Sequence, residues 1–498
     1  MKVTFVHLGR EHLGIEYLSS VLKKAGHEIS LAYDPGLFGT EDNVFYIPFL
    51  ERVFDRKNEV ISRIESSTPD LVAFSVYTSN YQWTCDVART IKEKMNVKTV
   101  FGGVHVSLVP EEVVKNDFVD FVIIGEGEYA LLDLVNTLSS NRPEYSIPNV
   151  WYKKGGEVIK NPLRPPIKDL DSLPFPDKGL FENYINYRDD YMVMTARGCV
   201  FSCSYCCEAY FHKIYSDGYF RRRSASSVIS ELKAMKKRYN FKRVMFFDSV
   251  FFTDKKWLSG FLHEYKKEIS VPFRCEGHVS FVDEDLIRLM KDSGCYGIDF
   301  GVQTFNESIR KDILHRNETN DQIDKAFSIC GKLKLRYDVD LIFGLPLVKE
   351  EDYELALEFM YSHKYFNRLK CYYLAYYPKL PIVDRAIELG IIYTKDVESF
   401  EKGNVGDFFH QDSINDPHHK AWKDNFEKLY KLFPVMPSFL KRFIIKKKLY
   451  RHFHIIPGFI VIVFQLAIGL CKRDFRFIIY IKYYLSHFKK KVVNYGRI

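Results

Sequence analysis

The chain lacks a regular cysteine framework. Of its 10 cysteines, only Cys199, Cys203 and Cys206 stand at a close, motif-like spacing, and the rest, apart from the adjacent Cys207, are scattered singly. Scattered cysteines argue against the disulfide scaffold of a small secreted protein and suit a reducing cytosol. A second close cysteine pair, which structural zinc sites usually have, is also missing.

Long uncharged hydrophobic runs are scarce. The N-terminal run, residues 1–8, lacks the length and the cleavage site of a signal peptide, so we expect a cytoplasmic protein. The uncharged run Ile455–Cys471 has seventeen residues and contains Pro457 and Gly458. As a helix it would span about 25 Å, short of the roughly 30 Å hydrocarbon core of a bilayer. The lack of a longer uncharged run disfavours a helix that spans the membrane.

Acidic residues are nearly absent from the C-terminal tail. Residues 441–498 carry 14 Lys or Arg and one acid, Asp474, whereas the whole chain has a net charge of only +8. Because the basic character belongs to the tail, the overall pI indicates no nucleic-acid partner. We predict that 441–498 makes peripheral contact with an anionic membrane, at its inner face. The alternative is a helical cap on the preceding domain, with its lysines in solvent.

The N-terminal part shows an alternation of strand and helix patterns. The predicted strands are Lys2–Leu8, Glu28–Tyr33, Leu71–Tyr77, Lys98–Gly102 and Asp120–Gly125. The predicted helices are Leu13–Ala25, Phe49–Ser66, Asn80–Met95 and Tyr129–Leu138. Such alternation indicates a parallel sheet covered on both faces, with ligands bound beyond the carboxyl ends of the strands.

Small and polar residues follow the ends of these strands. Glycine at such a position lets the backbone approach a ligand closely. The alternative is that these residues form plain strand-to-helix turns. The candidate ligand-contacting residues are Ser75, Thr78, Gly102, Gly103 and His105.

A second α/β pattern follows a linker. The linker contains a predicted hairpin, Val150–Ile159, and a proline-rich segment, Pro162–Pro176. About six strand–helix units then occupy residues 191–377, fewer than the eight of a closed TIM barrel. Their predicted strands are Tyr191–Thr195, Arg243–Phe247, Pro272–Glu276, Gly297–Gly301, Arg336–Phe343 and Leu369–Tyr376.

The three close cysteines lie just after the first of these strands. Three thiolates in one short loop can hold three irons of a [4Fe–4S] cluster and leave the fourth iron open for chemistry. A zinc site would need a fourth ligand, for which Cys207 and His212 are candidates. We predict the cluster, and therefore an enzyme.

This loop resembles the signature of the radical S-adenosylmethionine (SAM) superfamily, CxxxCxΦC, with Tyr205 as the aromatic residue before the last cysteine. The resemblance implies that the open iron binds SAM, and that reductive cleavage of SAM yields a 5′-deoxyadenosyl radical. The superfamily's partial barrel agrees with the count of about six units. An electron donor such as flavodoxin or ferredoxin would serve the cluster.

The resemblance also assigns roles at the carboxyl ends of the barrel strands, where barrel enzymes place their catalytic groups. Asp248 would meet the SAM amine, since a carboxylate suits an ammonium. Gln303 would bond the ribose or a polar substrate group. Arg316 would meet the SAM carboxylate.

Two further candidates lie at strand ends. Gly344 belongs to a stretch that resembles the GLPG sequence beside adenine, although Leu347 replaces the last glycine. Glu276 could contact a cofactor, or it could equally be a structural partner of Arg274.

Placed before such a barrel, the N-terminal domain resembles the cobalamin-binding domain of cobalamin-dependent radical SAM enzymes. The similar stretches are the helix from Leu13, the GG-x-H stretch at 102–105 and the GEGE stretch at 125–128. The usual D-x-H-x-x-G cobalt motif is not matched, so we expect His12 to be a loop or phosphate-side residue and not a cobalt ligand. The cofactor's tail would run past the strand-end residues named above.

These patterns predict an α/β chain of four regions: a Rossmann-like (flavodoxin-like) cobalamin-binding domain at 1–146, a linker at 147–188, a partial (β/α)6 barrel at 189–395 and a helical tail at 396–498. The implied reaction is methylation of an unactivated carbon of a small or lipid-like substrate. The alternatives are oxidative ring formation, as in the anaerobic porphyrin cyclases, and a membrane-associated iron–sulfur binding or sensor protein.

Overall fold

The computed structural model of the chain describes residues 1–39, 42, 46–140, 145–215, 218–363, 365–405, 417–471 and 479–487. The chain forms two compact units, each assembled from separate stretches of sequence. Unit 1 comprises 1–183, 201–221 and 375–413, and unit 2 comprises 184–200, 222–374 and 414–498.

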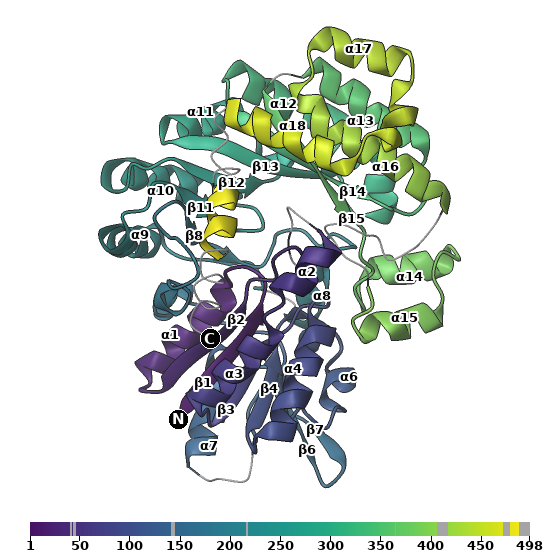
Figure 1. Ribbon diagram of the computed structural model, residues 1–498. Helices are drawn as coiled ribbons and strands as arrows, with labels where there is room; N and C mark the ends of the chain where they lie inside the picture. The colour runs from purple at the N-terminus through teal and green to yellow at the C-terminus, as the bar shows by residue number, and fades with distance from the viewer. Residues whose placement is uncertain are drawn as a thin grey trace. The chain divides into compact units, whose positions relative to one another are not determined.

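Unit 1 is built on a seven-stranded sheet in the order β2-β1-β3-β4-β5-β6-β7 (Figure 1). Its first five strands are parallel, and the last two form an antiparallel hairpin. The order 2-1-3-4-5 is that of flavodoxin-like folds, and it confirms the predicted class. The strands are β1 (Lys2–Leu8), β2 (Glu28–Asp34), β3 (Leu71–Ser75), β4 (Lys98–Gly102), β5 (Phe121–Ile123), β6 (Val150–Lys154) and β7 (Glu157–Lys160).

The helices of unit 1 follow the predicted pattern with one correction. The single helix predicted over Phe49–Ser66 is wrong, because the chain breaks at Asp55, where the backbone is extended and the carboxylate accepts the Lys57 N–H at 2.7 Å. The helices are α1 (Leu13–Lys24), α2 (Pro48–Phe54), α3 (Lys57–Ser67), α4 (Tyr81–Lys94), α5 (Val104–Leu108), α6 (Pro110–Val114), α7 (Glu128–Ser139), α8 (Cys207–Tyr215), α14 (Pro381–Glu388) and α15 (Thr394–Glu401).

The proline-rich linker packs on α1 through a buried charge. The ammonium of Lys178 is fully buried; it lies 2.9 Å from a carboxylate oxygen of Glu16 and also pairs with Glu11. Asp177 accepts a hydrogen bond from Ser19 at 2.6 Å. A buried ammonium is stable only when it is paired, so these contacts fix the linker to the N-terminal domain.

Unit 2 is built on six parallel strands in the order β15-β14-β13-β12-β11-β8. Strands β8 and β15 are the two edges, so the sheet is an open partial barrel, as predicted. The strands are β8 (Tyr191–Val193), β11 (Val244–Phe246), β12 (Phe273–Gly277), β13 (Cys295–Gln303), β14 (Arg336–Phe343) and β15 (Phe366–Tyr373).

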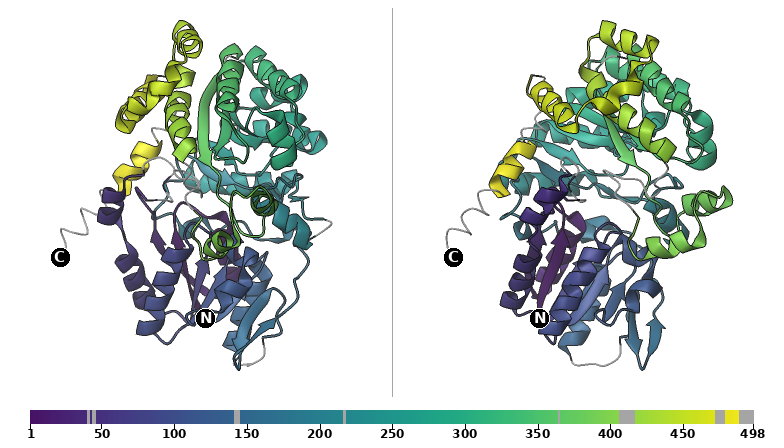
Figure 2. Two further views of the ribbon diagram at one scale, coloured as in Figure 1. Left: turned by 90° about the vertical axis from the view of Figure 1, so that its right-hand side faces the viewer. Right: turned by 45° about the vertical axis from the view of Figure 1, so that its right-hand side comes forward.

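Helices cover one side of this sheet (Figure 2). Residues such as Ile298, Phe300 and Val339 point toward the helices and are buried, while the alternate residues of each strand point to the opposite, inner face. The covering helices are α9 (Ala225–Tyr239), α10 (Lys255–Glu268), α11 (Glu284–Asp292), α12 (Asn320–Lys332) and α13 (Glu350–Ser362).

The C-terminal region is helical, as predicted. It comprises α16 (Pro417–Leu432), α17 (Ser438–Lys446), the 3-10 helix Leu449–Ile455 and α18 (Gly458–Cys471). Helix α16 packs against β15, where the Tyr373 hydroxyl donates to the Glu427 carboxylate at 2.5 Å.

Within the part of the chain that the structure describes, no single helix is long and apolar enough to cross a membrane. The segments Leu449–Ile455 and Gly458–Ala467 have the necessary composition only as a pair, and they are bent by 105° at their junction.

Candidate functional site

The predicted cluster loop carries three free thiols. Cys199 and Cys203 are buried and Cys206 is half-buried, and none of the three is in a disulfide. The Cys206 N–H donates to the Cys203 carbonyl at 3.0 Å, a turn that leads directly into α8. Three free thiols in one loop are the donor set that a [4Fe–4S] cluster with one open iron needs.

The thiols do not converge on one point in this structure. Among the described residues, no three Cys, His, Asp or Glu side chains gather closely enough to hold a metal ion, and this includes the zinc set with Cys207 and His212. The three cysteines fit the cluster by their chemistry and sequence, and their assignment as its ligands stays a prediction.

Asp248 anchors the backbone that leads into this loop. It lies just beyond β11, is buried, and accepts hydrogen bonds from the Thr195 N–H at 2.6 Å, the Thr195 hydroxyl at 2.5 Å and the Ala196 N–H at 2.9 Å. Arg222 donates to the same hydroxyl at 2.9 Å. Burial raises the pKa of Asp248, and the Arg222 charge opposes that rise. The carboxylate therefore positions the strand exit; its predicted contact with SAM is untested.

The inner face of the unit 2 sheet carries a network of charges. The Lys370 ammonium lies 2.8 Å from Asp299, 3.3 Å from Asp340 and 3.8 Å from Asp338. Arg274 also pairs with Asp299, at 3.2 Å. Adjacent parallel strands bring these side chains together in register, as with Asp340 beside Lys370. The lumen of the partial barrel is therefore polar.

Glu276 stands apart within this network. Arg274, which the sequence suggested as a partner of Glu276, pairs with Asp299 instead. Among the described residues, no basic side chain forms an ion pair with the Glu276 carboxyl. Burial and the nearby Asp299 raise the pKa of Glu276 to about 8. At neutral pH this half-buried carboxyl is protonated, so it can donate a hydrogen bond to a bound molecule.

Gln303 and Arg316 meet at the end of β13. Gln303 has a left-handed backbone with φ +70°, and its amide lies over Gly301, where an added Cβ would come within 2.6 Å of it. Arg316 is buried; it pairs with Glu318 at 2.6 Å and donates to the Gly301 carbonyl at 2.5 Å. Arg316 therefore ties its loop to β13, and its predicted contact with SAM is untested.

The end of β14 keeps the backbone shape that glycines favour. Gly344 has φ +78°, and Leu347 has φ +65°, in the region that non-glycine residues rarely adopt. Leu347 thus preserves the conformation of the glycine that it replaces in the GLPG-like stretch.

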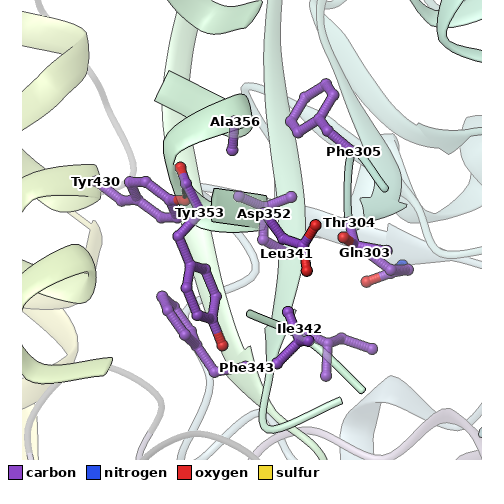
Figure 3. Close-up of a pocket in the computed structure, with 11 residues that line it drawn as sticks. Gln303, Thr304, Phe305, Leu341, Ile342, Phe343, Asp352, Tyr353, Ala356 and Tyr430 are labelled. Atoms are coloured by element: carbon purple, nitrogen blue, oxygen red, sulfur yellow. Dashed lines mark hydrogen bonds between the residues drawn. The ribbon is translucent and has the colours of Figure 1, made fainter. Parts of the chain in front are cut away.

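A small gap lies behind this strand end, between β14 and α13. Figure 3 shows its lining, in which the Asp352 carboxylate points toward Thr304. Its volume is about 10 Å³, about the space that one water molecule requires. The gap is too small for a substrate or a cofactor fragment.

In unit 1, the first polar pair at the sheet's carboxyl edge is His12 with Ser75. The His12 Nδ1 accepts the Ile15 N–H at 3.1 Å and so caps α1, and its Nε2 lies 3.1 Å from the Ser75 hydroxyl. Burial lowers the pKa of His12 to about 4, so the ring is neutral and its one proton is on Nε2. In this arrangement neither ring nitrogen has an unoccupied lone pair, and the expectation that His12 is not a cobalt ligand stays a prediction.

We expect His12→Ala to leave cobalamin binding unchanged. The substitution removes the N-cap of α1 and should lower the free energy of unfolding by about 1 kcal/mol. Cobalamin absorbance per chain and chemical denaturation measure the two effects. Loss of bound cobalamin from a folded variant would contradict the assignment.

The remaining strand-end candidates divide into interior and open positions. His105 and Thr78 are buried and bond each other at 3.1 Å. An added Cβ on Gly103 would lie 2.7 Å from the Val76 carbonyl, so close backbone packing requires that glycine. Gly102 differs, because an added Cβ would make only an ordinary contact of 3.8 Å with Ile123. Gly102 therefore has open space beside it and Ser75 is half-buried, and the contact of both with cobalamin stays a prediction.

A cavity that the sequence analysis missed opens at the same edge. It has a volume of about 240 Å³ and lies between β1, β2 and α2, with Leu8, Asp34, Leu37, Phe54 and Trp83 among its lining residues. It is smaller than typical sites for whole ligands, which exceed about 300 Å³, so it could hold only part of one.

The GEGE stretch packs against the helix that follows the cysteines. The Tyr215 hydroxyl of α8 accepts the Glu126 N–H at 2.8 Å, and an added Cβ on Gly125 would overlap that hydroxyl. Arg221 pairs with Glu126 at 2.9 Å. These contacts place the segment after the cysteine loop in unit 1, which no local sequence signal indicated.

Comparison with protein families matches two parts of the chain. Residues 10–135 match the B12 binding domain, and residues 193–360 match the radical SAM superfamily. The first match includes the parallel strands β2 to β5 of unit 1 but not β1, and the second includes β11 to β14 of unit 2 together with the cysteine loop.

Two curated relatives are similar over much of the chain. An uncharacterized methyltransferase of Pyrococcus horikoshii is 28% identical over 354 residues, which cover 70% of this chain and 72% of that protein. The anaerobic magnesium-protoporphyrin IX monomethyl ester cyclase of Rubrivivax gelatinosus is 25% identical over 320 residues, covering 60% and 56%.

A solved structure shares the fold over most of the chain. The cobalamin-dependent S-adenosylmethionine radical enzyme OxsB, with aqua-cobalamin and S-adenosylmethionine bound, superposes with a TM-score of 0.67 at 16% identity. The match covers 91% of this chain and 71% of that one.

Proposed function

The chain belongs to the cobalamin-binding radical SAM enzymes, with cobalamin, SAM and a [4Fe–4S] cluster as its cofactors, and from this we propose that it methylates an unactivated carbon of a small or lipid-like substrate. The observation that carries the proposal is the presence of a B12 binding domain and a radical SAM domain in one chain. An unactivated C–H bond has no acidic proton for a side-chain base, so the cofactors must supply the reactivity.

The chain's own residues would bind and position these groups. When bound, the cluster with SAM supplies radical chemistry and cobalamin supplies methyl transfer. Cys199, Cys203 and Cys206 would hold the cluster. Asp248 would fix the backbone before them through its bonds to Thr195 and Ala196. Preorganisation of this kind keeps a reacting group in place without movement during the reaction.

The charged lumen supports a polar reacting end of the substrate. Lys370 and its three carboxylates line the inner face of the sheet, beside the protonated carboxyl of Glu276. A purely hydrocarbon group would cover the Glu276 carboxyl without offering it a hydrogen-bond partner. We therefore propose that a lipid-like substrate would present its polar portion to the barrel.

Labelled methyl transfer tests the proposal. The protein, reconstituted without oxygen and reduced, would be incubated with SAM that carries a deuterated methyl group and with fractionated small-molecule and lipid extracts. We expect 5′-deoxyadenosine together with a product that carries the label. SAM cleavage without label transfer to any fraction would contradict methylation.

Ring formation is the second candidate, and the similarity to the Rubrivivax cyclase favours it. A cyclisation product loses hydrogen and gains no carbon, so mass spectrometry of the same reaction separates the two. The comparisons favour an enzyme over the iron–sulfur sensor considered from the sequence. We further propose a cytoplasmic location and a flavodoxin- or ferredoxin-type electron donor.

We expect Glu276 to make stability depend on pH. Its folded pKa of about 8 lies above the usual value of 4.5 for a glutamate, so the folded state holds a proton that the unfolded state releases. This contribution makes the free energy of unfolding fall as pH rises from about 4.5 to 8. The Gln side chain carries no such proton. The free energy of unfolding of Glu276→Gln, taken relative to that of wild type, should therefore rise by at least about 1.4 kcal/mol between pH 5 and pH 8.5, which corresponds to one pKa unit.

Chemical denaturation at both pH values measures this difference. Asp340→Asn, at a position whose carboxylate pairs with Lys370, serves as a comparison within the same lumen. An identical pH dependence in wild type and Glu276→Gln would show that the carboxyl titrates normally.

A further inference from the structure

Helix α17 presents an aromatic and basic face to solvent. Phe439 and Phe443 are 75% and 53% exposed, and Arg442 and Lys446 are exposed on the same side. Positions i, i+3, i+4 and i+7 lie on one face of a helix. Two exposed phenylalanines on one face have no packing role in the folded unit.

The opposite face of α17 holds the helix in place. Ile444 is buried toward α13, over which α17 lies in Figure 1. The Lys441 ammonium stacks on the rings of Phe366 and Phe433, at 4.9 and 4.8 Å from their centroids. The outward face of α17 is therefore fixed by contacts on its inward side.

Helix α18 also exposes apolar side chains. Phe459, Val463 and Phe464 are 67%, 59% and 55% exposed, and the preceding Ile455 is 69% exposed. Val461 is buried on the other side, where α18 packs on α16. We call the exposed side chains of α17 and α18, taken as a set, the C-terminal apolar surface.

The charges beside this surface are not neutralised. Lys448 pairs with Glu354 at 3.1 Å and Arg451 with Glu350 at 2.9 Å. By contrast, Arg442, Lys446 and Lys447 are exposed, and no carboxylate partner is found for them in the described ranges. The unpaired cations thus stand next to the exposed phenylalanines of α17.

We propose that the C-terminal apolar surface docks on an anionic lipid bilayer, with the phenylalanines in the interface and the cations against lipid headgroups. Basic residues beside exposed aromatic ones fit a negatively charged interface, and a second copy of the same face would bring like charges together. This goes beyond the proposed reaction, because docking needs no bound cofactor. It names the membrane-contacting residues, of which Phe439 lies just before the predicted region 441–498.

Vesicle co-sedimentation of the full-length protein tests the surface. The probes are vesicles of phosphatidylcholine alone and of phosphatidylcholine with phosphatidylglycerol. We expect binding to the anionic vesicles only. Arg442→Ala/Lys446→Ala should weaken it about thirtyfold, from roughly 1 kcal/mol for each cation. Phe439→Ser/Phe443→Ser should weaken it about tenfold or more.

Matched controls separate docking from misfolding and from catalysis. Phe49→Ser, at an equally exposed phenylalanine of α2, and Lys237→Glu/Lys266→Glu, on α9 and α10, should bind as wild type. We expect SAM cleavage in vesicle-free solution to be unchanged in all variants. If the protein cleaved no SAM, the proposed reaction would be wrong, but the docking proposal would stand. Three results would overturn the proposal. The protein could bind neutral vesicles equally well, or both α17 variants could bind as strongly as wild type. The protein could also form a dimer that only the α17 variants dissociate.

Discussion

Protein purified without oxygen and supplied with cobalamin should contain about four irons and about one cobalt per chain, and the variant Cys199→Ala/Cys203→Ala/Cys206→Ala should lose the iron while it keeps the cobalt. The three thiolates are the ligands that we predict for the iron, and among the described residues no other group of three Cys, His, Asp or Glu side chains could hold a metal ion. Cobalamin would bind at the carboxyl edge of the unit 1 sheet, near Gly102, where the substitutions make no change. Elemental analysis and the absorbance of each cofactor measure the iron and cobalt contents.

The consequence for activity should be complete. Without a cluster the protein cannot cleave SAM, so 5′-deoxyadenosine should fall to background in the triple variant. Cys207→Ala is the matched control, because this thiol adjoins the loop but lies outside the motif. It should keep its iron and its SAM cleavage.

Other outcomes would each overturn a part of this assignment. Zinc in place of iron, lost again in Cys207→Ala, would replace the cluster by a four-ligand zinc site. Iron without cobalt would remove methyl transfer through cobalamin and leave a radical SAM enzyme of another kind. Loss of cobalt in the triple variant, with the fold intact, would show that the cysteines also support cobalamin binding.

The second large effect is expected at Asp248. Asp248→Ala removes a carboxylate that accepts three hydrogen bonds from Thr195 and Ala196, and it takes away one of the two carboxylates, with Asp254, whose charge acts on the half-buried Arg222. Leaving buried hydrogen-bond donors without their acceptor costs about 1–3 kcal/mol. We expect the free energy of unfolding to fall by this amount and the iron content to fall with it, since the anchored backbone leads into Cys199.

Asp248→Asn separates positioning from direct contact with SAM. The amide keeps the size of the side chain but loses the charge and part of the accepting capacity, so stability and iron content should fall together, less than in Asp248→Ala. Asp283→Asn, at the N-cap of α11, is a control, because Asn also caps helices well. Normal stability and iron with weakened SAM binding would instead support the contact with the SAM amine.

Much of the fold could be predicted from the sequence because its signals are local. Strands β1, β4 and β14 begin and end at the predicted residues, since apolar runs bounded by turn residues depend only on neighbours along the chain. The order of the elements, alternating strand and helix, was enough to predict two parallel α/β sheets. The cysteine motif is equally local, because all three thiols lie within eight residues.

The partners of the candidate site residues could not be predicted in the same way. Arg274 stands two residues from Glu276, yet it pairs with Asp299 on the next strand. Burial then leaves Glu276 with a raised pKa, a property of the assembled lumen and not of its own sequence neighbours. Register between strands decides such pairs, and register is set by the packing of whole elements.

The sequence by itself determined the two domain types, the loop that can hold iron and the basic character of the tail, because each is written in a short or periodic stretch. Only the tertiary structure decided that α8 packs against Gly125 and Glu126, and that Asp248 secures Thr195. It also decided that the phenylalanines of α17 face outward. These contacts join residues up to 89 positions apart, and the choice among many distant partners is made by burial and charge pairing in the folded chain.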